Sequence, residues 1–171
     1  GFRQKIEVSD YAQKVADGSI EDDLNKVNVG EGDCFYIPAG RVHGIGAGMV
    51  IAEIQQTSDV TYRIYDYLRR DRDGNLRELH TELALEAINF QDITTDPKVV
   101  YTESRDAVVS LVECPFFTTN ELKLTKPFRR DYSGIDSFRV YMCLDGQCCF
   151  LSPAGQGIFL HQGESLVVPA S

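Results

Sequence analysis

The sequence predicts an all-β protein with a few short helices. After Gly30, short stretches rich in β-branched and aromatic residues alternate with Gly, Pro and Asp, which is typical of strands joined by turns. Helical patterns occur in residues 9–27 and 79–88. A short segment that ends in Pro-Ala occurs twice, once on each side of the second helical region. These observations together favour a β fold built from two similar parts.

The helical regions have recognisable boundaries. Within residues 9–27, Ser9 and Ser19 are the expected N-cap residues of two short helices, and Gly18 separates them. The apolar spacing in Leu79–Ile88 predicts one further helix. We therefore expect three short helices in the first half of the chain.

The strand predictions rest on residue type and on the turns between the strands. In the first half we expect three strands, at Cys34–Ile37, Val50–Gln55 and Thr61–Tyr67. Asp96-Pro97 predicts a boundary, and from Val99 onward the pattern returns to short strands. Turns are expected at Asp73-Gly74, Ser133-Gly134, Asp145-Gly146 and Gly155–Gly157.

The repeated segment follows one template. Residues 32–39 are Gly-Asp-Cys-Phe-Tyr-Ile-Pro-Ala, and residues 163–170 are Gly-Glu-Ser-Leu-Val-Val-Pro-Ala. In each copy the glycine permits a turn, a short strand follows, and the proline ends the pairing. Two such copies, each after a Gly-rich hairpin, resemble the cupin pattern, a small double-stranded β-helix or jelly roll present twice.

The repeat also predicts the domain organisation. The first copy continues into Gly40-Arg41-Val42-His43, whereas the second copy ends with the chain at Ser171. A cupin barrel needs further strands after that point, so we expect two incomplete cupin modules. Residues 1–95 would form the later part of a first, catalytic cupin with a helical insert. Residues 96–171 would form a second cupin, truncated at its C-terminus.

Composition excludes several classes of function. The 171 residues include 26 acidic and 17 basic side chains, and this net charge of −9 argues against a nucleic-acid partner. No run of about 18 apolar residues occurs, which excludes a membrane span. The five cysteines form no Cys-x-x-Cys pair, and no signal peptide opens the chain, so a cytoplasmic location is expected. A small phosphorylated ligand remains compatible, because one local cationic pocket can bind it.

Two residues of the first half are candidates for chemistry. His43 follows a Pro-terminated strand, where a cupin histidine points into the barrel and can bind a metal. A lone histidine is more often a surface or hydrogen-bonded core residue. Glu53 shares one face of its expected strand with Ile51 and Gln55. It is either an exposed carboxylate or an acid that lines the barrel, and the two interpretations have about equal weight.

Three longer segments indicate a family. They are Ile37-Pro38-Ala39-Gly40-Arg41-Val42-His43, Gln55-Gln56-Thr57-Ser58-Asp59-Val60-Thr61-Tyr62-Arg63-Ile64-Tyr65-Asp66-Tyr67 and Arg77-Glu78-Leu79-His80. Together they closely resemble the bacterial branch of the type I mannose-6-phosphate isomerases, which are zinc-dependent cupin enzymes. The resemblance runs from about Phe2 to Ala170 and is densest between Gly32 and Phe90. It implies the C-terminal portion of a short-form enzyme.

The resemblance implies roles for individual residues. In this family a Gln, two His and a Glu hold one zinc ion, and His43 matches the last His ligand. The other ligands belong to Gln-x-His-Pro and Lys-x-Glu segments that are expected upstream of residue 1, because residues 1–42 contain no His. Arg63 matches the active-site arginine, which suits a developing enediolate or the substrate phosphate. Glu53 matches an active-site carboxylate and would act as the base or orient it.

Alternatives remain open beside this interpretation. Arg63 could be a strand arginine paired with an acid such as Asp66. The remaining histidines, His80 and His161, have no partner at metal-ligand spacing and are expected to be structural. The expected function is interconversion of mannose 6-phosphate and fructose 6-phosphate. Its rivals are a non-catalytic sugar-binding or regulatory cupin and, less favoured with three histidines, an iron-dependent cupin oxygenase.

Overall fold

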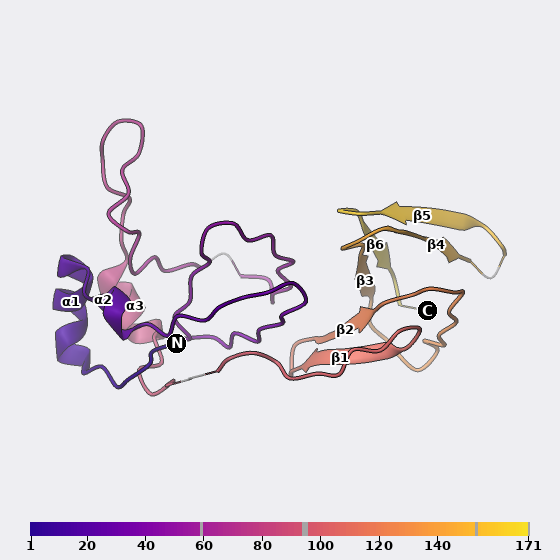
Figure 1. Cartoon of the computed structure of the whole chain (residues 1–171), viewed down its shortest axis with the longest axis horizontal. Coiled ribbons are helices and arrows are strands. Elements are labelled where there is room, and N and C mark those ends of the chain that lie inside the picture. Colours follow the sequence, from indigo (N-terminus) through magenta and orange to yellow (C-terminus); the bar gives the residue numbers. More distant parts are fainter. Residues whose placement is uncertain (59, 94–95, 153, 171) are drawn as a thin grey trace. The chain divides into compact units, whose positions relative to one another are not determined.

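A computed structural model of the chain describes residues 1–58, 60–93, 96–152 and 154–170. Asp59 of the family motif and the predicted boundary at residue 95 lie outside these ranges. Three helices precede six strands along the chain (Figure 1). The elements are α1 (Val8–Asp17), α2 (Ile20–Asp23), α3 (Thr81–Ala87), β1 (Val108–Glu113), β2 (Thr118–Leu122), β3 (Arg139–Met142), β4 (Gln147–Leu151), β5 (Gly157–His161) and β6 (Ser165–Val168).

The chain forms two compact units. The first contains residues 1–50 and 54–123, and the second contains residues 51–53 and 124–171. All three helices and the β1–β2 pair belong to the first unit, and the other four strands belong to the second. The predicted division into residues 1–95 and 96–171 stays a prediction.

The three predicted helices form, with small shifts at their ends. Ser19 is the N-cap of α2 as predicted, whereas α1 begins one residue before Ser9 and has Glu7 at its N-cap. Gly18 ends α1 in a left-handed conformation, with a φ of 82°. The third helix occupies the centre of the predicted range 79–88. In the part of the chain that the structure describes, no helix combines the length and apolar character needed to cross a bilayer.

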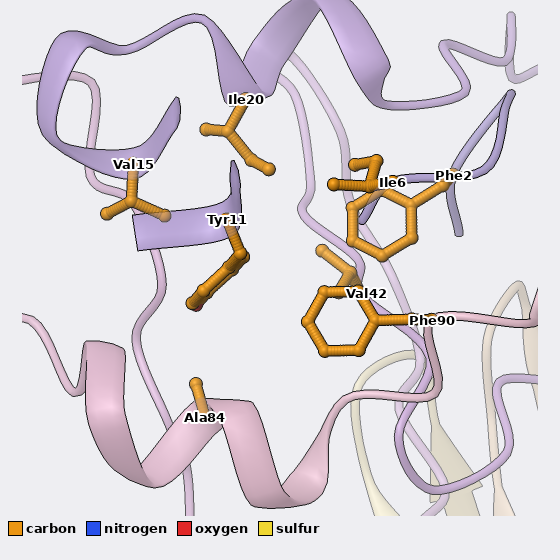
Figure 2. Packing of buried hydrophobic residues seen from close by; sticks show 8 residues of the cluster. All are labelled: Phe2, Ile6, Tyr11, Val15, Ile20, Val42, Ala84 and Phe90. Atoms are coloured by element: carbon orange, nitrogen blue, oxygen red, sulfur yellow. The ribbon is translucent and has the colours of Figure 1, made fainter. Parts of the chain in front are cut away.

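A single apolar core holds the helices of the first unit together. Figure 2 shows Tyr11 of α1 pointing toward Ala84 of α3, and neither side chain has any exposed surface. The rings of Tyr11 and Phe90 meet edge to face, with their centroids 5.6 Å apart, and Phe90 also stacks on Phe2 at 6.0 Å. Eight buried side chains form this core: Phe2, Ile6, Tyr11, Val15, Ile20, Val42, Ala84 and Phe90.

The second unit contains two nested strand pairs. β3 pairs with β6 and, inside that pair, β4 pairs with β5, both in antiparallel register. The predicted turn at Asp145-Gly146 lies directly before β4, and the one at Gly155–Gly157 leads into β5. Such nested pairing results when one long hairpin folds back on itself, as in a jelly roll. The first unit contributes one further antiparallel pair, β1 with β2, which has an irregularity in register between Ser110 and Val112.

The three strands predicted in the first half are wrong. The structure assigns none of residues 34–37, 50–55 and 61–67 to a strand. A segment becomes a strand only when a neighbouring backbone completes its hydrogen bonds. Of these segments, the first has one isolated bridge, between Phe35 and Lys98. β propensity predicted extended backbone here, but it does not supply the partner.

The two copies of the repeated segment have turns of the same structure. Gly32 and Gly163 both have a φ of 84°, which favours glycine. In each copy the acid after the glycine accepts a hydrogen bond from the backbone N–H three residues earlier: Asp33 from Gly30 at 2.7 Å and Glu164 from His161 at 2.8 Å. These hydrogen bonds lower the pKa of both carboxyl groups. The strand after the turn forms only in the second copy, because only there does β3 pair with it over four residues.

Tyr11 provides a test of the core. Its hydroxyl is buried and has no hydrogen-bond partner among the described residues, so Tyr11→Phe should raise the free energy of unfolding by roughly 1 kcal/mol at pH 7. Burial raises the pKa of Tyr11 to about 12. Because the folded state favours the neutral phenol over the phenolate, the free energy of unfolding falls as the pH rises from 10 through 12.

Urea unfolding between pH 7 and pH 12 measures both effects. The gain in free energy of unfolding from Tyr11→Phe should grow above pH 10. The control Tyr62→Phe changes a side chain that is 38% exposed and should have the same free energy of unfolding as the parent. A Tyr11→Phe variant clearly less stable than the parent at pH 7 would mean that the hydroxyl has a partner.

Candidate functional site

Arg63 lies in the first unit, just before two residues that pack on the core, Ile64 and Tyr65. Its side chain is half-buried, and its guanidinium donates a hydrogen bond to the carbonyl oxygen of Glu78 at 3.2 Å. The backbone of Arg63 is paired as well. The backbone N–H of His80 donates to the Arg63 carbonyl at 2.8 Å, and the Arg63 N–H donates to the Nδ1 atom of His80 at 2.9 Å. Arg63 is thus held at its backbone and at its guanidinium.

Asp66 is not the partner of Arg63. This carboxylate is 7% exposed, pairs with Arg69, and lies 3.6 Å from the guanidinium of Arg77. The hydrogen bond from Arg69 is the largest cause that lowers the pKa of Asp66. Among the described residues no carboxylate lies within salt-bridge distance of Arg63. The alternative expectation of a salt bridge between Arg63 and Asp66 is not met among the described residues, although the charge of Arg63 helps to lower the pKa of Asp66. The Arg63 guanidinium keeps donors for an anionic ligand.

His43 is exposed, and it follows Val42, a member of the core. Its Nδ1 atom lies 3.0 Å from the carbonyl oxygen of Arg41. A carbonyl can only accept, so Nδ1 carries a proton, and in the neutral imidazole Nε2 keeps the lone pair. Metal-binding histidines are commonly oriented in this way, by donating the other ring N–H to a carbonyl. The geometry of His43 thus suits zinc ligation through Nε2.

An ion pair holds the segment that carries His43. The guanidinium of Arg41 donates to both carboxylate oxygens of Asp92, at 2.6 and 3.0 Å, and to the carbonyl of Tyr36 at 3.0 Å. The hydrogen bond with Asp92 raises the pKa of Arg41. Sequence reasoning missed this pair, because its members lie 51 residues apart and no local pattern connects them.

Gly40 brings the same segment against the end of α3. Its φ is 82°, and its carbonyl accepts a hydrogen bond from the N–H of Asn89 at 2.9 Å. A methyl group at this position would lie 2.8 Å from the carbonyl oxygen of Ala87, which is too close for a carbon atom. Only glycine fits there, so the approach of residues 40–43 to α3 depends on it.

Tyr67 lies between the segment that carries Arg63 and the segment that carries His43. It has a φ of 55°, an uncommon value for a non-glycine residue, and its hydroxyl lies close to Gly44, where a methyl group would be 3.7 Å away. Arg63 and His43 therefore belong to segments that approach each other through Tyr67 and Gly44. No hydrogen bond joins the two candidate side chains themselves in the described part of the chain.

Glu53 belongs to the second unit, and its side chain is exposed. Because residues 50–55 form no strand, the expected alternation that would place Glu53 on one face with Ile51 and Gln55 is not observed. Within the described ranges, no group of three or more His, Cys, Asp or Glu side chains is arranged to hold a metal ion. The role of His43 as a zinc ligand stays a prediction, and its hydrogen bond to the Arg41 carbonyl is compatible with that role.

The remaining candidates form local contacts. The Nδ1 atom of His161 lies 3.1 Å from Glu164 in the turn before β6. All five cysteines are free thiols, and burial raises the pKa of Cys148. A raised pKa disfavours the thiolate, which is the nucleophilic form.

The fold resembles that of a solved structure. The chain superposes on the crystal structure of a sugar-phosphate isomerase, the mannose 6-phosphate isomerase from Bacillus subtilis, with a TM-score of 0.70 and 23% sequence identity. The likeness covers 98% of this chain and 52% of that one, and at this identity it concerns the fold alone. Strands outnumber helices, as predicted for a cupin-type protein, and the arrangement in two modules stays a prediction.

Comparison of sequences identifies the relatives. Mannose-6-phosphate isomerase ManA from Bacillus subtilis is 40% identical over 120 residues, which are 65% of this chain and 38% of that protein. The mannose-6-phosphate isomerase from Streptococcus mutans is 37% identical over 66% of this chain and 36% of its own length. YvyI from Bacillus subtilis, provisionally named as the same enzyme, is 41% identical over 90% of this chain and 48% of its own length. No family model matches the chain.

The chain is thus a relative of sugar-phosphate isomerases. In particular, it is related to the mannose-6-phosphate isomerases, and the resemblance carried by its motifs is confirmed. It spans less than half the length of each of these three curated relatives.

Three glycines test the packing of residues 40–43 on α3. Gly40→Ala should lower the free energy of unfolding by roughly 2–4 kcal/mol, because it combines backbone strain with a clash. Gly48 has a similar φ of 78° but no atom within 4 Å of an added methyl group, so Gly48→Ala should lose only about 1–2 kcal/mol. Gly46→Ala, with neither constraint, should stay within about 0.5 kcal/mol of the parent.

Thermal or urea unfolding of the three variants separates strain from packing. Equal losses in Gly40→Ala and Gly48→Ala would contradict the close approach of Gly40 to the end of α3.

Proposed function

We propose that this chain forms part of a zinc-dependent mannose-6-phosphate isomerase, which interconverts mannose 6-phosphate and fructose 6-phosphate. The sequence similarity to curated enzymes of that name supports the proposal. The substrate would be a small phosphorylated sugar. The cytoplasmic location and the absence of nucleic-acid and membrane partners expected from the sequence belong to the same proposal.

The observation that carries the proposal is the environment of the Arg63 guanidinium. Its guanidinium is half-buried, oriented by the Glu78 carbonyl, and without a salt-bridged carboxylate among the described residues. The Glu78 carbonyl and the backbone contacts with His80 fix this cation in place without a salt bridge. A fixed cation with donors to spare suits the substrate phosphate or the negative charge of an enediolate.

The reaction moves a proton between C1 and C2 of the open-chain sugar. A base must remove the proton from one carbon atom and return it to the other, and a cation must stabilise the enediolate between these steps. Arg63 would supply the positive charge. Glu53 would act as the base or would orient it, in keeping with the family match of that residue.

Zinc would be held in part by His43, through Nε2. Because Nδ1 donates to the Arg41 carbonyl, the neutral imidazole of His43 keeps its lone pair on Nε2, where a metal would bind. When bound, zinc supplies a Lewis acid that polarises the sugar oxygens at C1 and C2. The other ligands are expected from the Gln-x-His-Pro and Lys-x-Glu segments of the family pattern.

The proposal is tested by an isomerase assay on mannose 6-phosphate, with the full-length product of the gene that encodes this chain. Turnover should disappear when zinc is chelated and return when zinc is added. A folded, zinc-loaded protein without turnover would refute the enzyme. Binding of mannose 6-phosphate to such a protein would identify the non-catalytic sugar-binding cupin instead.

In the active protein, Arg63→Ala should lower kcat/KM by about 100- to 1000-fold, because a charged donor to the anionic intermediate is lost. Arg63→Lys should recover part of that loss, since it keeps the charge but not the planar geometry of the guanidinium. Arg72→Ala is the matched control, because Arg72 is an exposed arginine of the neighbouring turn. Equal activities of Arg63→Ala and Arg72→Ala would rule out the role given to Arg63.

A further inference from the structure

His80 makes three hydrogen bonds that connect Arg63 to α3. Its backbone N–H donates to the Arg63 carbonyl at 2.8 Å, and its Nδ1 atom accepts from the Arg63 N–H at 2.9 Å. Its own carbonyl accepts from the N–H of Ala84 at 2.8 Å, which closes the first turn of α3. Ala84 has no exposed surface and belongs to the core. A continuous path of hydrogen bonds therefore runs from the core to Arg63.

The chemistry of the contact defines the state of the imidazole. An amide N–H can only donate, so Nδ1 of His80 is unprotonated and the ring proton lies on Nε2. This is the opposite tautomer to that of His43, whose Nδ1 faces a carbonyl. A side chain without an acceptor at the Nδ1 position leaves the half-buried Arg63 N–H unpaired. His80 is thus more than the N-cap residue of α3, because its ring bonds to the residue that would meet the substrate.

The same loop fixes the other end of Arg63. Glu78, two residues before His80, accepts a hydrogen bond from the guanidinium at 3.2 Å through its backbone carbonyl. A shift of residues 78–80 would therefore move both the backbone and the guanidinium of Arg63. Displacement of about 1 Å at a catalytic group is enough to slow a reaction by about 100-fold.

We propose that His80 is a positioning residue for Arg63, which it holds through the hydrogen bond from the Arg63 N–H to its Nδ1 atom. The inference rests on the proposed function, because it gives His80 its effect through the substrate-binding arginine. It assigns to this histidine neither metal binding nor contact with the sugar.

Paired variants test the inference in the full-length gene product. His80→Leu removes the acceptor, whereas His80→Asn keeps an amide oxygen near the position of Nδ1. We expect His80→Leu to lower kcat/KM by about tenfold, the rate equivalent of one net hydrogen bond, and His80→Asn to recover most of it. His161→Leu, which removes a histidine of the other unit, should leave the activity within about twofold.

A double-mutant cycle separates positioning from general destabilisation. If His80 acts through Arg63, His80→Leu should change the same parameter, kcat or KM, as Arg63→Ala does, and the double variant should be no slower than Arg63→Ala alone. Additive losses, or an effect on the other parameter, would overturn the inference. Equal activities of His80→Leu and the parent would overturn it as well.

Amide hydrogen exchange of the 171-residue chain provides a readout that needs no activity. The Arg63 amide should exchange slowly in the parent and in His80→Asn, and at least about tenfold faster in His80→Leu. Unchanged protection of this amide in His80→Leu would refute the hydrogen bond itself. A parent protein without isomerase activity but with the expected protection would instead refute the proposed function, and with it the catalytic meaning of the contact.

Discussion

The first unit depends on the burial of a small apolar core between short helices and the loops that pass over them. Helices of ten, four and seven residues are too short to be stable alone, so tertiary packing must hold them. The rings of Tyr11, Phe2 and Phe90 pack against one another within this core. Because Val42 and Ile64 also pack on this core, its formation fixes the two segments that carry His43 and Arg63.

Backbone hydrogen bonds convert this packing into defined positions for functional groups. The Arg41 carbonyl orients His43, and the loop before α3 orients Arg63. In both cases the functional side chain lies one residue before or after a core residue, so small movements of the core would reach it. The Arg41–Asp92 pair and the glycine at position 40 hold the first of these segments just before its histidine in the chain. Precision at the candidate site thus comes from groups that need not touch a ligand.

Local sequence signals predicted the elements whose structure is decided locally. Glycine turns such as Asp145-Gly146, the helix boundary at Gly18 and the common turn of the repeat all follow from backbone freedom at one residue. The strands expected at 34–37, 50–55 and 61–67 fail for the opposite reason, because pairing depends on a remote segment. The same limit applies to the site. The sequence predicts His43 and Arg63 as candidates. The hydrogen bond between His80 and Arg63 joins residues 17 positions apart, and no local sequence pattern indicates it.

The central claim is that His43 and Arg63 serve one reaction from neighbouring segments of the first unit. The most direct test is an experimental structure of the full-length gene product with zinc and fructose 6-phosphate bound. The account predicts zinc on Nε2 of His43, the Arg63 guanidinium within hydrogen-bond distance of the sugar or its phosphate, and His80 still bonded to the Arg63 backbone. Zinc bound away from His43, or a sugar phosphate bound out of reach of Arg63, would contradict it.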